Sequence, residues 1–309
     1  MDPLPLPAWI FFDVGWTLVD EMPAHLKRFD AVRRAMPGGV GPEAAELFRR
    51  YEAGFTARVP DPFARILEEC GLPPAERGRY PFDHEVTRLY RGAGPALRAL
   101  RGVMRLGVLA NQSKGLTERL DGFGLGGLFD LVLGSADCGF AKPDPRLFAY
   151  AAERAASPPA SLLMVGDRLD NDIGPARRAG WRTAWVRRGP HAKCEPSGPA
   201  ETPDLIVSKL TRLAALFVPE ERLALARHLD AKDAIVSWPE KERDKRLVVE
   251  HLATRFAAGK DYSEKEVNAL IVALHRFDDY ALLRRELVDR GLLNRTADGS
   301  RYWRPQAGR

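Results

Sequence analysis

Polar side chains follow three short apolar runs of this 309-residue chain, where they could do chemistry. Asp13 follows AWIFF, Asn111 follows RLGVLA, and Asp167 follows SLLMVG; Lys142 and Asp172 lie in the polar stretches AKPDP and GDRLDND. Carboxylate oxygens bind hard cations such as Mg²⁺, and a lysine beside them stabilises charge on a phosphate. These residue types therefore indicate metal-assisted phosphoryl transfer.

The elements that must position these residues are short apolar runs that alternate with helical stretches such as 147–156. Continuous apolar strands alternating with helices predict a parallel sheet that is covered on both faces. Ligands of such sheets bind at the carboxyl ends of the strands, so we expect the polar residues there to converge. The expected strands lie within 8–14, 105–111, 128–135, 161–167, 182–188 and 204–210.

The connection between the first two strands is longer than a crossover needs. It carries helical patterns at 24–36, 43–57, 62–70 and 83–91. We interpret it as a helical cap above the site.

These patterns divide the first part of the chain into two predicted domains. An α/β core covers residues 1–20 and 92–218, and the cap covers 21–91. The Pro- and Gly-rich segment 189–203 is expected to be a loop before an edge strand.

After residue 218 the strand patterns stop, which predicts a separate domain over 219–309. Helical patterns cover 238–260, 262–275 and 279–291, and Ser263 with Glu266 has the spacing of a capping box. Asp298-Gly299 is a strong hairpin signal. Three helices followed by a hairpin predict a winged-helix-like α+β module.

Three motifs, in this order, resemble those of the haloacid-dehalogenase (HAD) superfamily: DVGWT at 13–17, AKPDP at 141–145 and GDRLDND at 166–172. The resemblance covers roughly residues 8–215, and the insert resembles the family's first type of cap. It implies a Rossmann-like core and a Mg²⁺-dependent hydrolase, namely a phosphatase that acts on a small phosphate ester.

The resemblance also implies roles for individual residues. Asp13 would be the nucleophile that forms an aspartyl-phosphate, and Lys142 would neutralise Asp13 and the phosphate. The metal would be held by Asp13, the Gly15 carbonyl, Asp167 and Asp172. The phosphate would be bound by Asn111, Gln112 and Lys142, whereas Asp170 and Asn171 are expected to lie further from the metal.

Two departures from the family pattern affect catalysis. Phosphatases of the family have an aspartate at the position of Gly15, where it protonates the leaving oxygen and later activates water. A positioned acid/base contributes roughly 10²–10⁴ in rate, which glycine cannot supply. Ala110 stands where the family usually has Ser or Thr bonding the phosphate, a role for which Asn111, Gln112 or Ser113 could compensate.

These departures leave two functions open, a slow phosphatase and a catalytically degenerate module that binds a phosphorylated ligand and acts in regulation. If only the acid/base is missing, a Gly15→Asp variant is expected to gain roughly 10²-fold in rate. Dehalogenation of small acids fits poorly, because that branch of the family needs no metal and the aspartates of GDRLDND suit one.

Other residues of the cap and its entrance could bear on the chemistry. His25, His84 and Glu85 could supply the missing acid, although a lone residue of these types on a cap is more often structural. Asp20 is expected to contact substrate or cap. Trp16, next to the expected metal site, is expected to pack under the cap.

Residues 238–304 resemble an uncharacterised domain family that is attached to transcriptional regulators. The candidate recognition helix has more acids than arginines, which is a poor surface for phosphate backbones. We therefore expect a protein partner or a homodimer through this domain, ahead of nucleic acid. The acids are Asp278, Asp279, Glu286 and Asp289, and the arginines are Arg284, Arg285 and Arg290.

Bulk composition adds few constraints. The net charge of +5 does not demand a nucleic-acid partner, and no apolar stretch is long enough for a membrane helix. The first residues lack the pattern of a signal peptide. Three widely spaced cysteines fit free thiols in a reducing cytoplasm.

Overall fold

The computed structural model describes residues 6–38 and 41–305, which form two compact units. The first contains residues 1–94 and 103–213, and the second contains 95–102 and 214–309. Within the described residues, no helix combines the length and apolar character that a membrane span requires. The domain boundary expected at residue 219 stays a prediction, and the second unit includes residues 95–102 as well as those from Ala214 onward.

The first unit is built on a six-stranded sheet in the order β5-β4-β1-β6-β7-β8, in which every neighbouring pair is parallel. All six predicted strands are present. Trp9 of β1 pairs with Arg105 of β4 on one side and with Leu162 of β6 on the other. The strands are Trp9–Phe12 (β1), Arg105–Ala110 (β4), Leu131–Gly134 (β5), Leu162–Gly166 (β6), Arg182–Val186 (β7) and Leu205–Val207 (β8).

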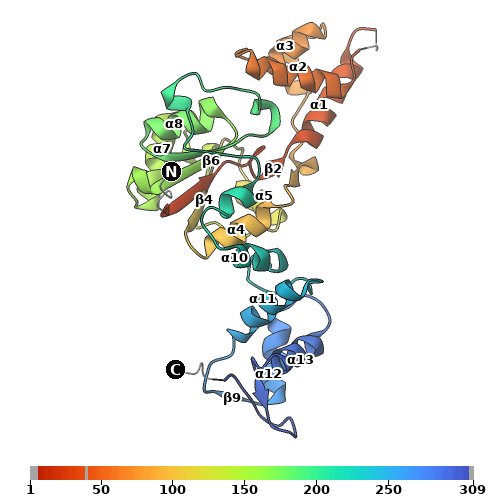
Figure 1. Ribbon diagram of the computed structural model, residues 1–309. Helices are drawn as coiled ribbons and strands as arrows, with labels where there is room; N and C mark the ends of the chain where they lie inside the picture. Colours follow the sequence, from red (N-terminus) through yellow and green to blue (C-terminus); the bar gives the residue numbers. More distant parts are fainter. Residues whose placement is uncertain (1–5, 39–40, 306–309) are drawn as a thin grey trace. The chain divides into compact units, whose positions relative to one another are not determined.

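Helices cover the sheet because its central strands are apolar on both faces; every residue of β1 and β6 is buried. Figure 1 shows α7 and α8 beside the sheet. On this face, Leu147 and Phe148 of α7 and Ala176 of α8 pack with Phe11 and Met164 of the sheet. The helices of the first unit are Leu116–Gly122 (α5), Ser135–Cys138 (α6), Pro145–Ala155 (α7), Gly174–Arg178 (α8) and Leu210–Ala214 (α9), whereas most of Ala93–Arg101 (α4) belongs to the second unit. The fold class predicted from the sequence is therefore confirmed.

The insert after β1 forms a helical cluster of its own. Its helices are Met22–Ala35 (α1), Ala44–Thr56 (α2) and Pro62–Glu69 (α3), close to three of the predicted segments. Phe29, Phe48 and Phe63 form the centre of the cap's apolar core.

The helix expected over 83–91 is wrong. This segment forms a short 3₁₀ turn at His84–Val86 and then the strand Arg88–Leu89 (β3), which pairs antiparallel with Val19–Asp20 (β2). The two strands lie where the chain enters and leaves the cap. Backbone pairing between these distant segments prevails over a local helical pattern.

The second unit contains the three predicted helices and the hairpin. Ser263 and Glu266 form the capping box of α12, with both hydrogen bonds present. A three-stranded antiparallel sheet, β10-β11-β9, includes one strand that was not predicted, Asp261–Tyr262 (β9). The remaining elements are Glu220–Leu225 (α10), Glu242–Ala253 (α11), Glu264–Ala273 (α12), Tyr280–Asp289 (α13), Asn294–Arg295 (β10) and Tyr302–Trp303 (β11).

Candidate active site

Three polar residues meet because β1 is flanked by β4 and β6, so the carboxyl ends of these strands are adjacent. Asp13 follows β1, Asn111 follows β4, and Asp167 follows β6. The Asp13 backbone N–H donates to the Val165 carbonyl (2.9 Å), which extends the pairing of β1 with β6 by one residue, to Asp13. The convergence expected from strand ends is what the structure shows.

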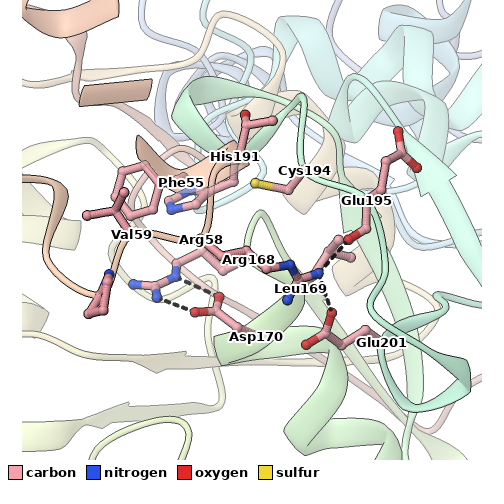
Figure 2. Close-up of a pocket in the computed structure, with 12 residues that line it drawn as sticks. Phe55, Arg58, Val59, Arg168, Leu169, Asp170, His191, Cys194, Glu195 and Glu201 are labelled. Atoms are coloured by element: carbon pink, nitrogen blue, oxygen red, sulfur yellow. Dashed lines mark hydrogen bonds and ion pairs between the residues drawn. The ribbon is translucent and has the colours of Figure 1, made fainter. Parts of the chain in front are cut away.

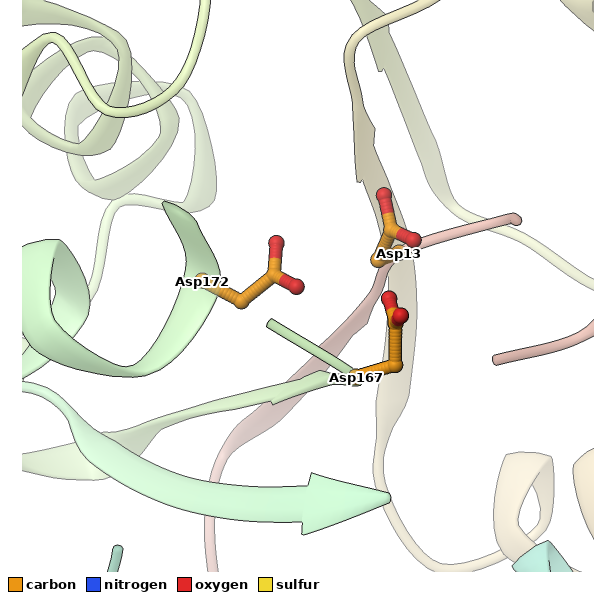
Figure 3. Close-up of side chains that lie close together, drawn as sticks. All are labelled: Asp13, Asp167 and Asp172. Carbon is orange, nitrogen blue, oxygen red and sulfur yellow. The ribbon is translucent and has the colours of Figure 1, made fainter. Parts of the chain in front are cut away.

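An acidic cluster forms at this edge of the sheet (Figure 3). Asp13, Asp167 and Asp172 each present a carboxylate oxygen, and these oxygens all lie within 4.8 Å of one another. Asp172 reaches the cluster from a π-helical turn, Leu169–Ile173, and its side chain packs where a Cβ on Gly166 would stand. Three converging hard oxygens are a donor set that fits Mg²⁺.

Lys142 provides the counter-charge of this cluster. Its side chain is 1% exposed, and its Nζ lies 2.6 Å from Asp13 Oδ1 and 2.5 Å from Asp172 Oδ1. A buried ammonium between two carboxylates neutralises part of their mutual repulsion. The four residues that the motifs singled out therefore form one cluster, in which the three aspartates line a cavity and Lys142 lies beneath them.

Burial dominates the electrostatics of the site. It raises the pKa of Asp13 to about 7, against the opposing effect of Lys142, and it raises the pKa of Asp167 as well. A divalent cation among these oxygens would lower both pKa values, because it favours the ionised carboxylates.

Asn111 contacts the lysine backbone in this structure. Its side-chain amide donates to the Lys142 carbonyl and accepts from the Lys142 N–H, both at 2.7 Å. Asn111 thus orients the lysine loop. Gln112 lines a cavity next to the acidic cluster, and its Oε1 accepts a hydrogen bond from Arg119 Nη2 (3.1 Å). Phosphate binding by Asn111 and Gln112 stays a prediction.

Gly15 lies beside a carboxyl group from the cap entrance. A Cβ built on Gly15 would lie 2.6 Å from Glu21 Oε1 and 2.9 Å from Oε2. The Gly15 carbonyl accepts from Thr17 N–H (2.6 Å) and keeps a second lone pair for a metal. Burial, followed by the charges of Asp13 and Asp167, raises the pKa of Glu21 to about 8.

Two other residues that the sequence singled out, Trp16 and His25, pack among aromatic side chains of the cap. Trp16 packs in the cap's apolar core, as expected. His25 lies among the rings of Trp16, Phe48 and Tyr51, and burial lowers its pKa to about 3. Its neutral ring fits packing better than acid catalysis.

The remaining candidates lie at the entrance to the cap. Asp20 accepts a hydrogen bond from Met22 N–H (3.0 Å) at the start of α1. Glu85 is exposed and His84 is half-buried. Asp170 pairs with Arg168 (2.7 Å), away from the acidic cluster.

His191 is a site residue that sequence analysis missed. It is buried, and its Nδ1 lies 2.8 Å from Asp167 Oδ2. The Trp185 indole N–H donates to the Asp167 backbone carbonyl (2.7 Å). Two rings therefore position this aspartate, His191 at its carboxylate and Trp185 at its backbone. The signal that could have found His191 is its position shortly after β7, at the same edge of the sheet.

The site opens into a cavity of about 210 Å³ between core and cap, lined by Asp13, Glu21, Tyr51 and Asp167 among others. Figure 2 shows the side chains that line a second cavity, of about 240 Å³. Phe55, Arg168 and His191 line both cavities. The His191 ring packs against Phe55 of the cap, with ring centroids 4.2 Å apart.

Family models match two parts of the chain. Residues 139–213 match a family described as HAD-hydrolase-like, and residues 234–304 match one described as an uncharacterised protein conserved in bacteria, DUF2087. Phosphoserine phosphatase of Thermus thermophilus is 38% identical over 177 residues, which are 53% of this chain and 66% of that protein. The chain thus spans slightly less than two thirds of this relative.

Two further similarities extend over most of the first unit. Glyceraldehyde 3-phosphate phosphatase of Methanopyrus kandleri is 29% identical over 242 residues, 72% of this chain and 98% of that protein. The magnesium-bound structure of the HAD-hydrolase YfnB from Bacillus subtilis has a TM-score of 0.52 at 22% identity, covering 69% of this chain and 99% of that one. The likeness to this structure shows a shared fold, an α/β fold with a Rossmann-like core.

Proposed function

We propose that this chain is a Mg²⁺-dependent phosphatase of the HAD superfamily that hydrolyses a small phosphate ester through an aspartyl-phosphate on Asp13. The observation that carries the proposal is the meeting of Asp13, Asp167 and Asp172, which line one cavity, with Lys142, which pairs with two of them from behind. The phosphatase names of its relatives support the reaction class. A cavity of about 210 Å³ favours a small substrate.

The residues of the cluster account for transfer of the phosphoryl group to the protein. Lys142 holds Asp13 in place and attracts the substrate phosphate. An Asp13 oxygen attacks phosphorus, the bond from phosphorus to the ester oxygen breaks, and the ester oxygen takes a proton from a donor that Gly15 cannot supply. Water then attacks the phosphorus of the aspartyl-phosphate, which releases inorganic phosphate and regenerates Asp13. Mg²⁺ bound by Asp13, Asp167, Asp172 and the Gly15 carbonyl would neutralise charge on the phosphate.

The test is an Asp13→Asn variant assayed on a panel of phosphate esters with Mg²⁺ or with EDTA. Wild-type turnover that requires Mg²⁺ and falls by roughly 10³-fold or more in Asp13→Asn is expected, since the nucleophile is lost. Asp121→Asn, an exposed aspartate outside the site, is the matched control. Activity that survives in Asp13→Asn contradicts the nucleophile assignment.

A second candidate function is the degenerate module that binds a phosphorylated ligand without turning it over. It is favoured by Gly15, which lacks an acid side chain, and by Ala110, which is fully buried and offers no hydroxyl. Phosphate binding by calorimetry, without turnover of any ester in the panel, is the result that this alternative requires.

For the second unit we propose a protein-docking or dimerising role. Its α13 has few free cationic groups, because Arg284 pairs with Glu264, and Arg290 pairs with Glu242 and Glu286. Arginines engaged in this way are poor ligands for phosphate backbones. Sedimentation of the full chain tests dimerisation, and fluorescence anisotropy with duplex DNA at low salt tests the nucleic-acid alternative.

A further inference from the structure

The site lacks an acid/base carboxyl at position 15, where the family pattern has an aspartate. Gly15 contributes only backbone. Of the cap residues that the sequence analysis considered, His25 is neutral and packed among rings, Glu85 is exposed, and His84 is half-buried. Glu21 was not among them. It lies six positions after Gly15, at the N-terminus of the first cap helix.

The position of the Glu21 carboxyl is the central observation. A Cβ on Gly15 would lie 2.6 Å and 2.9 Å from its two oxygens and 2.8 Å from its carboxyl carbon. The carboxylate oxygens of an aspartate lie roughly 2.4 Å from its own Cβ, as bond lengths dictate. The Glu21 carboxyl therefore lies against the point from which a side chain at position 15 would start, with its oxygens at nearly the distance of an aspartate's own.

The contacts of Glu21 do not explain its position structurally. Although Glu21 is the residue that caps α1, its side chain makes no capping hydrogen bond. Within residues 6–38 and 41–305, its carboxyl has no hydrogen-bond donor and no cationic partner. A carboxyl that lines an acidic cavity without a partner is available for a ligand in that cavity.

We infer that Glu21 supplies the acid/base function that Gly15 lacks. This inference rests on the proposed phosphatase function. Glu21 gives its proton to the ester oxygen as the phosphorus–oxygen bond breaks, and its carboxylate then takes a proton from the attacking water. The glutamate is thereby protonated again, so each turnover consumes one ester and one water and yields one alcohol and one phosphate.

Gly15 and Glu21 are then a matched pair. The glutamate reaches the site because residue 15 has no side chain, and a side chain there would have to displace it. A single Gly15→Asp change therefore places a second carboxylate against Glu21 and Asp13. The gain in rate that the sequence suggested for Gly15→Asp is expected only after Glu21 has been shortened.

The experiment compares wild type with Glu21→Gln on two substrates, an alkyl phosphate and an activated aryl phosphate whose alcohol leaves without a proton. Alkyl phosphate turnover is expected to fall by roughly 10²–10⁴-fold. The aryl phosphate is expected to give a rapid burst of about one alcohol per chain, followed by slow turnover, because Asp13 still attacks while hydrolysis of the aspartyl-phosphate lacks its base.

The controls separate this inference from the proposed function. Glu68→Gln changes an exposed glutamate of cap helix α3 and is expected to keep wild-type rates. The double variant Gly15→Asp/Glu21→Gly returns the carboxyl from position 15 and is expected to recover at least 10-fold of the loss seen in Glu21→Gly. Thermal unfolding confirms that each variant folds.

Two outcomes overturn the inference and leave the proposed phosphatase function intact. In the first, Glu21→Gln lowers the turnover of both substrates by less than about threefold. In the second, it lowers both turnover rates equally, with no burst and no rescue by the double variant. Wild type that turns over neither ester, with Mg²⁺ present, overturns the proposed function itself, and the role of Glu21 falls with it.

Discussion

Lys142 Nζ lies 2.6 Å from Asp13 Oδ1 in an almost fully buried position, so the proposed nucleophile depends on this lysine for its charge balance. The same ammonium pairs with Asp172. Removing one partner of a buried ion pair leaves an uncompensated charge in a poorly solvated place, which destabilises a protein by about 3–5 kcal/mol.

A Lys142→Met variant is therefore expected to lose phosphatase activity and about 3–5 kcal/mol of unfolding free energy in the absence of metal. Mg²⁺ is expected to restore part of this stability, because it replaces the missing positive charge among the carboxylates. Urea unfolding with EDTA and with Mg²⁺ measures both effects. Equal stability of variant and wild type in EDTA would show that the lysine does not balance these acids.

His191 and Asp167 give a second prediction. Partners that orient a metal-ligating carboxylate contribute roughly 10–100-fold to metal affinity. A His191→Ala variant is therefore expected to need roughly 10–100-fold more Mg²⁺ for half-maximal activity. The control is His251→Gln in the second unit, where the ring contacts the Asp233 carbonyl. A half-saturating Mg²⁺ concentration that stays within twofold of wild type contradicts the orienting role.

The positions of Asp13, Asn111 and Asp167 could be predicted because each directly follows a run of buried residues. Such runs form adjacent parallel strands, whose carboxyl ends lie side by side. Glu21 and His191 could not be predicted in the same way. Glu21 reaches the site through the path of the chain into the cap, and His191 through a loop that turns back over the strand ends. Such contacts depend on long-range geometry, which has no periodic pattern in the sequence.

The prediction of a helix over 83–91 was wrong for a related reason. Its local pattern is helical, but Arg88 and Leu89 gain backbone hydrogen bonds by pairing with Val19 and Asp20. Those partners lie about 70 residues away, and no local pattern shows their proximity. The second unit was more predictable because its capping box and its hairpin turn are local signals.

The buried ring of His25 gives a pH-dependent prediction. Burial, with smaller contributions from Arg28 and His191, lowers the pKa of His25 from its ordinary value of 6.5 to about 3. Below pH 6.5, His25 is therefore protonated in the unfolded chain but not in the folded chain. Because of this difference, the unfolding free energy falls as the pH decreases from about 6.5 toward about 3. The slope for one proton is about 1.4 kcal/mol per pH unit.

A His25→Phe variant keeps an aromatic ring in the same cluster and removes this titration. Between pH 7.5 and pH 5, wild type is expected to lose about 2 kcal/mol more unfolding free energy than the variant. Urea unfolding at a series of pH values gives the difference, in which the titrations common to both proteins cancel. Parallel curves for the two proteins would mean that His25 takes up its proton without unfolding the cap.

The capping box of the second unit allows its stability to be changed without touching the catalytic residues. Ser263 Oγ accepts from the Glu266 N–H, and the Glu266 carboxylate accepts from the Ser263 N–H (2.7 Å). Ser263→Ala removes the first of these bonds and is expected to destabilise α12 and its unit by about 1 kcal/mol. Lys265→Ala, an exposed change on the same helix, is the control. Hydrogen exchange of the second unit measures the loss, and unchanged protection of α12 in Ser263→Ala would contradict it.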